Sequence, residues 1–140
     1  MIRKRTGFAV SVFVLALSCS AYATIGQLEG KWKNVDSSTT GITTLETQVS
    51  GNKVTVHASG KCSPMDCDWG TVDATACAPD VSSLLPSKAH ALSAVFKTNF
   101  DETRLIIDTV DGNKLRVESM THFTDNSGRS NYSAVYHFAH

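Results

Sequence analysis

Residues 102–123, ETRLIIDTVDGNKLRVESMTHF, contain the pattern that decides the fold. After the run Asp111-Gly112-Asn113, the apolar residues Leu115 and Val117 alternate with charged ones, and before the run Leu105 and Ile107 fall on one face. A period of two predicts strands with one buried face, and a short run of Asp, Gly and Asn between two strands predicts a hairpin turn. This stretch therefore predicts an antiparallel β-hairpin.

The same period of two, interrupted by turn residues, continues through the rest of the chain from residue 30 onward. Ser50-Gly51-Asn52 is a second hairpin signal, and the Pro-containing stretch 78–88 is the one long connection, with room for a helical turn. The pattern predicts eight strands, at 30–36, 42–49, 53–59, 68–76, 89–99, 102–110, 114–123 and 130–139.

Eight short strands joined mostly by hairpins predict an all-β fold. An antiparallel up-and-down β-barrel of about eight strands suits this order because closing the sheet removes both edges, and a two-sheet β-sandwich is the alternative. Several positions in phase with the apolar face are polar but uncharged, which would suit either a packed core or a small internal cavity. These positions are Asn34, Thr47, Thr71, Thr98, Ser119 and Thr121.

The first 23 residues have the features of a secretion signal. Basic Arg3-Lys4-Arg5 precedes an apolar run over 7–17 that is too short to span a bilayer, and the triplet Ala21-Tyr22-Ala23 matches a signal-peptidase site. We expect cleavage after Ala23 and an exported, periplasmic or extracellular domain over 24–140 with no stable membrane span. Cys19 offers the alternative of lipid attachment.

Charge and composition indicate one ordinary globular domain. The 140 residues are 41% apolar and 19% charged, with 13 basic and 13 acidic residues. Removing the leader takes away three basic residues and leaves a formal charge of −3. The chain therefore carries no basic field of the kind that binds nucleic-acid phosphates, and disordered, collagen-like and coiled-coil classes are excluded.

Three cysteines remain after the leader is removed. Cys62 and Cys67 bracket a short loop with turn residues, which predicts a disulfide between them, and Cys77 would be a buried free thiol, an intermolecular bridge, or the true partner of one of the pair. The alternative is a metal site, because this segment gathers imidazole, thiol and carboxylate groups. We favour the disulfide and predict no metal or cofactor, because no second Cys/His pair follows at short spacing. The metal alternative would use His57, Cys62, Asp66, Cys67 and Asp68.

Residues 28–34, LEGKWKN, resemble the first strand of calycins, the lipocalin, fatty-acid-binding and avidin group of β-barrels. The resemblance is closest to avidins, and it implies that Trp32 plugs one end of a barrel. It also implies that Asn34 and Ser38 stand where avidins hold the ureido group of biotin.

Residues 56–70, VHASGKCSPMDCDWG, resemble a family of small exported bacterial domains to which no function is assigned. The resemblance extends to 34–36 and 125–132. The run is expected to form a strand, then a cross-linked corner, and then a strand on which Trp69 is a lid or an interior residue.

The sequence does not favour an enzyme. It has no Gly-x-Ser-x-Gly nucleophile motif, no His-Glu-x-x-His and no Gly-rich phosphate loop. His57, His122 and His137 alternate with apolar residues and should face solvent. We therefore expect a small-molecule ligand in the mouth of the barrel, with candidate site residues Trp32, Asn34, Ser38, Trp69, Tyr132 and Tyr136.

A second hypothesis is a protein-binding module. The turn Ser127-Gly128-Arg129 is similar to the Ser-Gly loop that bacterial C-type lysozyme inhibitors insert into the lysozyme cleft. An exposed Arg129 would bind a carboxylate of the partner through two parallel hydrogen bonds.

Overall fold

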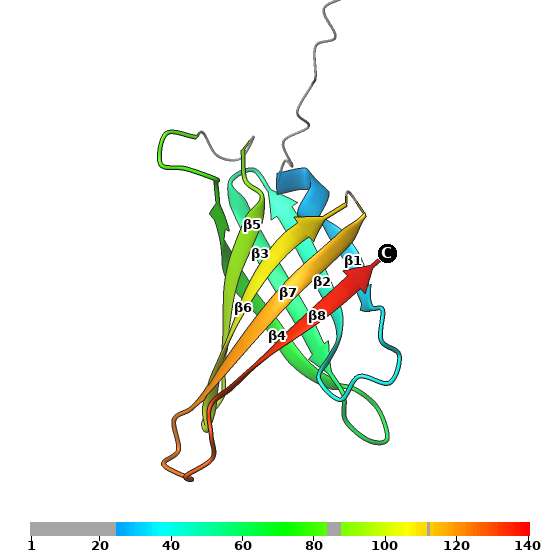
Figure 1. Ribbon diagram of the computed structural model, residues 1–140, viewed down its shortest axis with the longest axis vertical. Helices are drawn as coiled ribbons and strands as arrows, with labels where there is room; N and C mark the ends of the chain where they lie inside the picture. Colours follow the sequence, from blue (N-terminus) through cyan, green and yellow to red (C-terminus); the bar gives the residue numbers. More distant parts are fainter. Residues whose placement is uncertain (1–24, 84–87, 112) are drawn as a thin grey trace, which may run out of the picture.

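The protein, described here by a computed structural model, is a closed antiparallel barrel of eight strands in chain order (Figure 1). The structure describes residues 25–83, 88–111 and 113–140, so the predicted leader, its cleavage site and Cys19 lie outside the described residues. The predicted up-and-down barrel is confirmed, and the sandwich alternative is wrong because β8 pairs with β1. The elements are the 3-10 helix η1 (Ile25–Leu28) and the strands β1 (Gly30–Asn34), β2 (Ile42–Ser50), β3 (Lys53–Gly60), β4 (Cys67–Cys77), β5 (Ala91–Lys97), β6 (Asp101–Val110), β7 (Lys114–Phe123) and β8 (Tyr132–Ala139).

Strand β5 ends earlier than the sequence pattern predicts. Thr98 was expected on the inner face, but it begins the turn into β6, where its Oγ1 accepts hydrogen bonds from the backbone N–H groups of Phe100 and Asp101. A Thr hydroxyl that satisfies a turn in this way competes with strand pairing. The prediction for Thr98 is therefore wrong, because local turn bonding outweighs the alternation.

A β-bulge in β4 reverses the facing of residues that follow it. Asp68 lies opposite Ser59 and Gly70 lies opposite Ala58, so that Trp69 is an additional residue in the strand. Gly70 has a φ of 81°, the left-handed conformation that suits Gly at a bulge. Thr71 was predicted to face inward, but after the bulge it faces outward. The prediction is wrong because one extra residue inverts the period of two.

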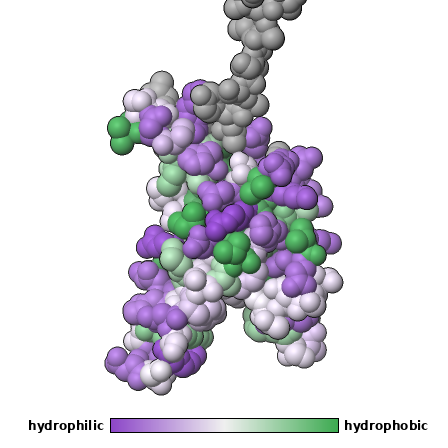
Figure 2. Space-filling model, in the orientation of Figure 1, coloured by the Kyte–Doolittle hydropathy of each residue, from purple (hydrophilic) through white to green (hydrophobic). Residues whose placement is uncertain are grey.

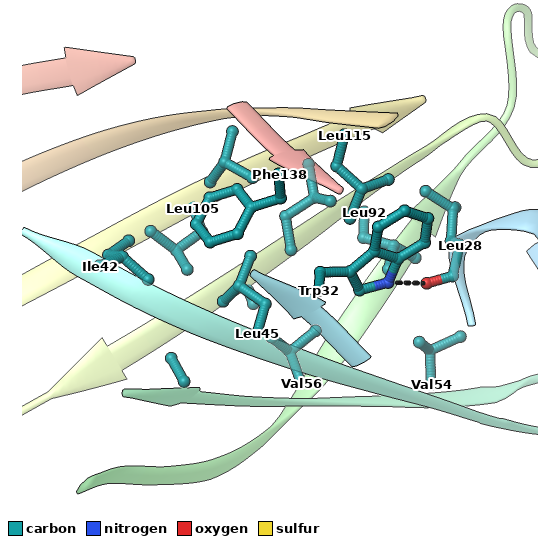
Figure 3. Close-up of a cluster of buried hydrophobic side chains, with 14 of the residues drawn as sticks. Leu28, Trp32, Ile42, Leu45, Val54, Val56, Leu92, Leu105, Leu115 and Phe138 are labelled. Carbon is teal, nitrogen blue, oxygen red and sulfur yellow. Dashed lines mark hydrogen bonds between the residues drawn. The ribbon is translucent and has the colours of Figure 1, made fainter. Parts of the chain in front are cut away.

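The buried core runs through the barrel from Leu28 of η1 to Ile42 at the start of β2 (Figure 3), and we call the end with η1 the core end. Trp32 is 1% exposed, and its indole N–H donates to the backbone oxygen of Leu28 at 3.2 Å. The predicted inward positions Thr47, Ser119 and Thr121 are buried as well. The aliphatic and aromatic side chains of this core come from η1 and from strands on every side, among them Leu45, Val56, Leu92, Leu105, Ile107, Leu115 and Phe138.

The two ends of the barrel differ. η1, the hairpin turn at 51–52, the end of β6 and the start of β7 lie at the core end (Figure 1). Loops 35–41, 61–66, 98–100 and 124–131 extend from the opposite end, which we call the mouth. The space-filling view shows the molecule hollowed between two projections at the mouth (Figure 2). Neighbouring strands diverge there: β4 pairs with β5 only from Ala74 opposite Ala94 to Cys77 opposite Ala91.

The outer face of the barrel carries polar side chains, as the alternation along the strands predicts. His57, His122 and His137 lie on the outer side of their strands, as predicted. Within the described residues, no helix has the length and apolar character that a membrane crossing requires.

Candidate functional site

A pocket of about 360 Å³ lies in the mouth, and we call it the mouth pocket. Its walls come from β4, from the end of β5, from the β5–β6 turn, from β6 and from β8, so that segments far apart in the chain meet at one place. Four aromatic rings line it, and three of them are partly exposed: Trp69 by 36%, Phe100 by 46% and Tyr132 by 55%, with Phe96 below them at 5%. Large apolar side chains at a concave surface are typical of ligand sites.

Trp69 is directed into the mouth by the bulge in β4. Its ring lies against Gly60, where a Cβ atom would come within 2.7 Å of the indole nitrogen. The ring also reaches across the gap between β4 and β5 to Phe96, with 5.8 Å between ring centroids and 70° between ring planes. Trp69 therefore bridges two strands that do not pair at this level, and Gly60 leaves the space for it.

Polar groups of the mouth pocket are arranged around the rings. The Thr103 hydroxyl lies in the pocket wall and is 2.9 Å from the Thr121 hydroxyl, so this buried pair satisfies itself. Asp68 and Asp101 add carboxylates. Lys97 also lines the pocket, but its Nζ lies 3.0 Å from Glu102, and this hydrogen bond lowers the pKa of Glu102.

A disulfide between Cys62 and Cys67 forms the edge of the pocket and confirms the predicted pairing. Both thiols of the alternative metal site are therefore used in the disulfide. His57 Nε2 lies 2.7 Å from Asp68 Oδ1, which also accepts the N–H of Gly70. The Gly70 hydrogen bond, followed by that with His57, lowers the pKa of Asp68. No cluster of three or more His, Cys, Asp or Glu side chains suited to a metal occurs in the described residues.

Asn34, Ser38 and Tyr136 meet at a second hollow of about 420 Å³, the side pocket, between loop 35–41 and β8. Asn34 Nδ2 donates to Ile42 O at 2.7 Å, and its Oδ1 accepts the N–H of Asp36. The Ser38 hydroxyl donates to Asp36 and lowers the pKa of that carboxyl. Asn34 and Ser38 thus hold loop 35–41 in its shape through their own hydrogen bonds.

Tyr136 packs against loop 35–41 at Gly41 without a hydrogen bond to the loop. Its hydroxyl makes no hydrogen bond within the described residues, and burial raises its pKa. A Cβ at Gly41 would lie 2.1 Å from that hydroxyl, so the close approach of the loop to Tyr136 requires Gly.

Trp32 does not join the other predicted site residues. It lies at the core end, where the ring of His140 packs over it with 3.7 Å between ring centroids. The predicted set therefore divides into three places: Trp32 in the core, Asn34, Ser38 and Tyr136 at the side pocket, and Trp69 with Tyr132 at the mouth pocket.

The loop with Ser127, Gly128 and Arg129 projects beside the mouth and is organised around Arg129. The guanidinium donates to Asp125 at 2.6 Å through Nη2 and to Ser127 at 2.9 Å through Nε. It also lies over the Phe123 ring, 4.0 Å from the ring centroid. Arg129 therefore holds its own loop in place.

Sequence reasoning did not identify Phe96, Phe100 and Thr103 as pocket residues. Phe96 lies at the end of β5, and Phe100 lies in the following turn, where the alternation of a strand no longer predicts the direction of a side chain. The sequence did offer one signal for these pocket residues: Phe96 stands near the end of a strand and Phe100 stands in the turn that follows it. Cys77 is exposed on β4 and unpaired, so the expectations that it is buried or joined to Cys62 or Cys67 are wrong.

Comparison of the chain with known protein families, curated proteins and solved structures found no match.

Proposed function

We propose that this protein is a binding protein that takes a small molecule in the mouth pocket. The observation that carries the proposal is the gathering of Trp69, Phe100 and Tyr132, all partly exposed, around one pocket at the open end of a barrel whose other end is filled. Exposed aromatic side chains cost solvation free energy when no partner covers them, and a ligand would cover them.

A thermal-shift screen of the purified domain against small metabolites tests this proposal. A ligand that binds the folded state raises Tm by mass action, by an amount that grows with ligand concentration. Tyr132→Ala should reduce the shift, and Val81→Ala, an exposed apolar residue in the β4–β5 connection at the other end of the barrel, should not. Absence of any shift at millimolar ligand in the wild-type protein would refute the proposal, as would a shift that Tyr132→Ala leaves unchanged.

The alternative of a protein-binding module, such as a lysozyme inhibitor, rests on Ser127, Gly128 and Arg129. Arg129 already donates to Asp125 and Ser127 within its own loop, which leaves fewer donors for a partner's carboxylate. This internal engagement favours the small-molecule proposal. Equal retention of wild-type protein and Arg129→Ala on immobilised lysozymes would count against the loop as a binding element.

We propose that the protein is exported and belongs with the calycin-like barrels. The leader pattern at 1–23 supports export, and the Cys62–Cys67 disulfide is compatible with an oxidising compartment. The position of Trp32 at the filled end of an eight-strand barrel supports the calycin resemblance. Mass spectrometry of the secreted chain should find Thr24 as its first residue; a lipidated Cys19 or an intact leader would refute this cleavage.

A further inference from the structure

We propose that the mouth pocket recognises a small organic cation, with a methylated ammonium group held among the rings of Trp69, Phe100 and Tyr132. This inference rests on the proposed function and adds the chemical class of the ligand. Three observations support a cationic ligand: the geometry of the rings, the charge of the pocket wall, and a cation that already packs on neighbouring rings.

The rings that line the pocket come from different strands and are not all coplanar. Trp69 comes from β4, Phe96 from β5 and Tyr132 from β8, so they approach the pocket from different sides. The planes of Trp69 and Phe96 are inclined by 70°. A flat sugar or aromatic ring is best stacked on one exposed face, whereas a compact, rounded group such as trimethylammonium contacts several rings at once.

The charge of the wall favours a cation over an anion. Asp101 and Asp68 line the pocket, although Oδ1 of Asp68 is already engaged by outward-facing His57 and by the Gly70 N–H. Among the described residues of the lining, the basic side chain is that of Lys97, which pairs with Glu102. Carboxylates beside aromatic faces add their attraction to that of the ring quadrupoles. An anionic ligand would meet repulsion from the Asp101 carboxylate above all.

The neighbouring loop shows that rings at this end of the barrel take a cation. The guanidinium carbon of Arg129 lies 4.0 Å from the centroid of Phe123 and 5.4 Å from that of Phe100. Phe100 is also a wall of the mouth pocket.

Isothermal titration of the mature protein with choline and with 3,3-dimethylbutan-1-ol tests the inference. The second compound has the shape of choline with a carbon in place of the charged nitrogen. We expect choline to bind about tenfold more tightly than this uncharged analogue, as one strong cation–π contribution would give.

Variants separate the contribution of the rings from that of charge. Trp69→Leu keeps an apolar side chain but removes the ring, and it should weaken choline binding about tenfold. Asp101→Asn should weaken choline and leave the uncharged analogue unaffected, whereas Asp73→Asn, which changes an exposed carboxylate paired with Lys53 on the outer face of β4, should alter neither. Circular dichroism of each variant checks that the barrel has folded.

Each outcome has a distinct meaning. Equal binding of choline and its uncharged analogue would overturn the cation inference and leave the proposed function in place. A second outcome would also overturn the cation inference and leave the proposed function in place. In it, choline does not bind, but a neutral or anionic metabolite from the thermal-shift screen does, and Trp69→Leu abolishes that binding. Absence of any ligand in that screen would overturn the proposed function itself.

Discussion

Trp32 and Trp69 are the two tryptophans of the chain, and their surroundings are opposite. Trp32 is buried in the core and donates to Leu28, whereas Trp69 is partly exposed in the mouth pocket. The same residue type therefore serves packing at one end of the barrel and forms an open aromatic surface at the other.

Stability measurements should separate the two tryptophans. Trp32→Phe removes buried volume and the indole hydrogen bond to the Leu28 carbonyl, which keeps the Thr47 hydroxyl as a donor. The variant should lower the free energy of unfolding by about 1–3 kcal/mol. Trp69→Phe should change the free energy by no more than about 0.5 kcal/mol, since it alters a partly exposed side chain. Urea denaturation followed by circular dichroism measures both values; equal losses would contradict the assignment of Trp32 to the core and Trp69 to the mouth.

We expect the order of the loop that holds Asp125 to depend on pH. Hydrogen bonding from Ser127, followed by that from Arg129, lowers the pKa of Asp125 from 3.8 to about 2. A lowered pKa means that the folded loop favours the carboxylate, so its stabilising effect is complete above pH 3.8 and is lost as the pH falls toward 2. NMR signals of the Arg129 side chain should report this loss.

The variant Asp125→Asn is the control for that titration. At neutral pH its Arg129 side chain should already give the NMR signals that the wild-type protein gives near pH 2. These signals should not change further on acidification, because the titrating carboxyl group is absent. If Arg129 in the wild-type protein keeps the same signals at pH 5 and at pH 2, the ion pair does not organise the loop.

At the scale of elements, alternation predicted each strand and failed where a local feature interrupted it. Thr47, Ser119 and Thr121 lie inside as predicted because their strands are regular. Thr71 faces outward because the bulge inserts Trp69 as an extra residue, and Thr98 belongs to a turn. A bulge depends on the pairing of two strands, so the sequence of one strand does not predict it.

The cross-linked corner between β3 and β4 should contribute measurably to stability. The cysteines are five positions apart, and closing so short a loop in the unfolded chain stabilises the folded state by about 2 kcal/mol. The double variant Cys62→Ser/Cys67→Ser should lose this amount in urea denaturation. Cys77→Ser, which removes an exposed unpaired thiol, should retain the wild-type value, and a double variant as stable as wild type would refute the contribution.

At the scale of the whole molecule, the barrel is closed at the core end and opens at the mouth. β8 pairs with β1 through Phe138 and Ala139, and Val35 N–H donates to His137 O, but nearer the mouth no strand of the described chain pairs with β8 on that side. Because backbone groups alternate in direction along a strand, the N–H of Val135 points toward the β1 side, like that of His137. The wall of the barrel is therefore incomplete beside the side pocket.

Hydrogen exchange should reveal this opening residue by residue. The amide of Val135 should exchange much faster than that of Tyr136, which points toward β7, and than that of Val117 inside the continuous sheet. NMR exchange rates in the ligand-free protein measure the difference. Equally slow exchange at Val135 and Tyr136 would mean that the barrel wall is complete in solution.

The sequence by itself determined the strands, the up-and-down order of the barrel and the Cys62–Cys67 pairing, because alternation, turn residues and short loops are local properties of the chain. The tertiary structure alone decided which residues meet. It placed Trp32 at the opposite end from Trp69, and it brought Phe96, Phe100 and Tyr132 together from segments far apart in the chain. Such a meeting depends on strand register and on the bulge at Trp69, which arise only when strands pair.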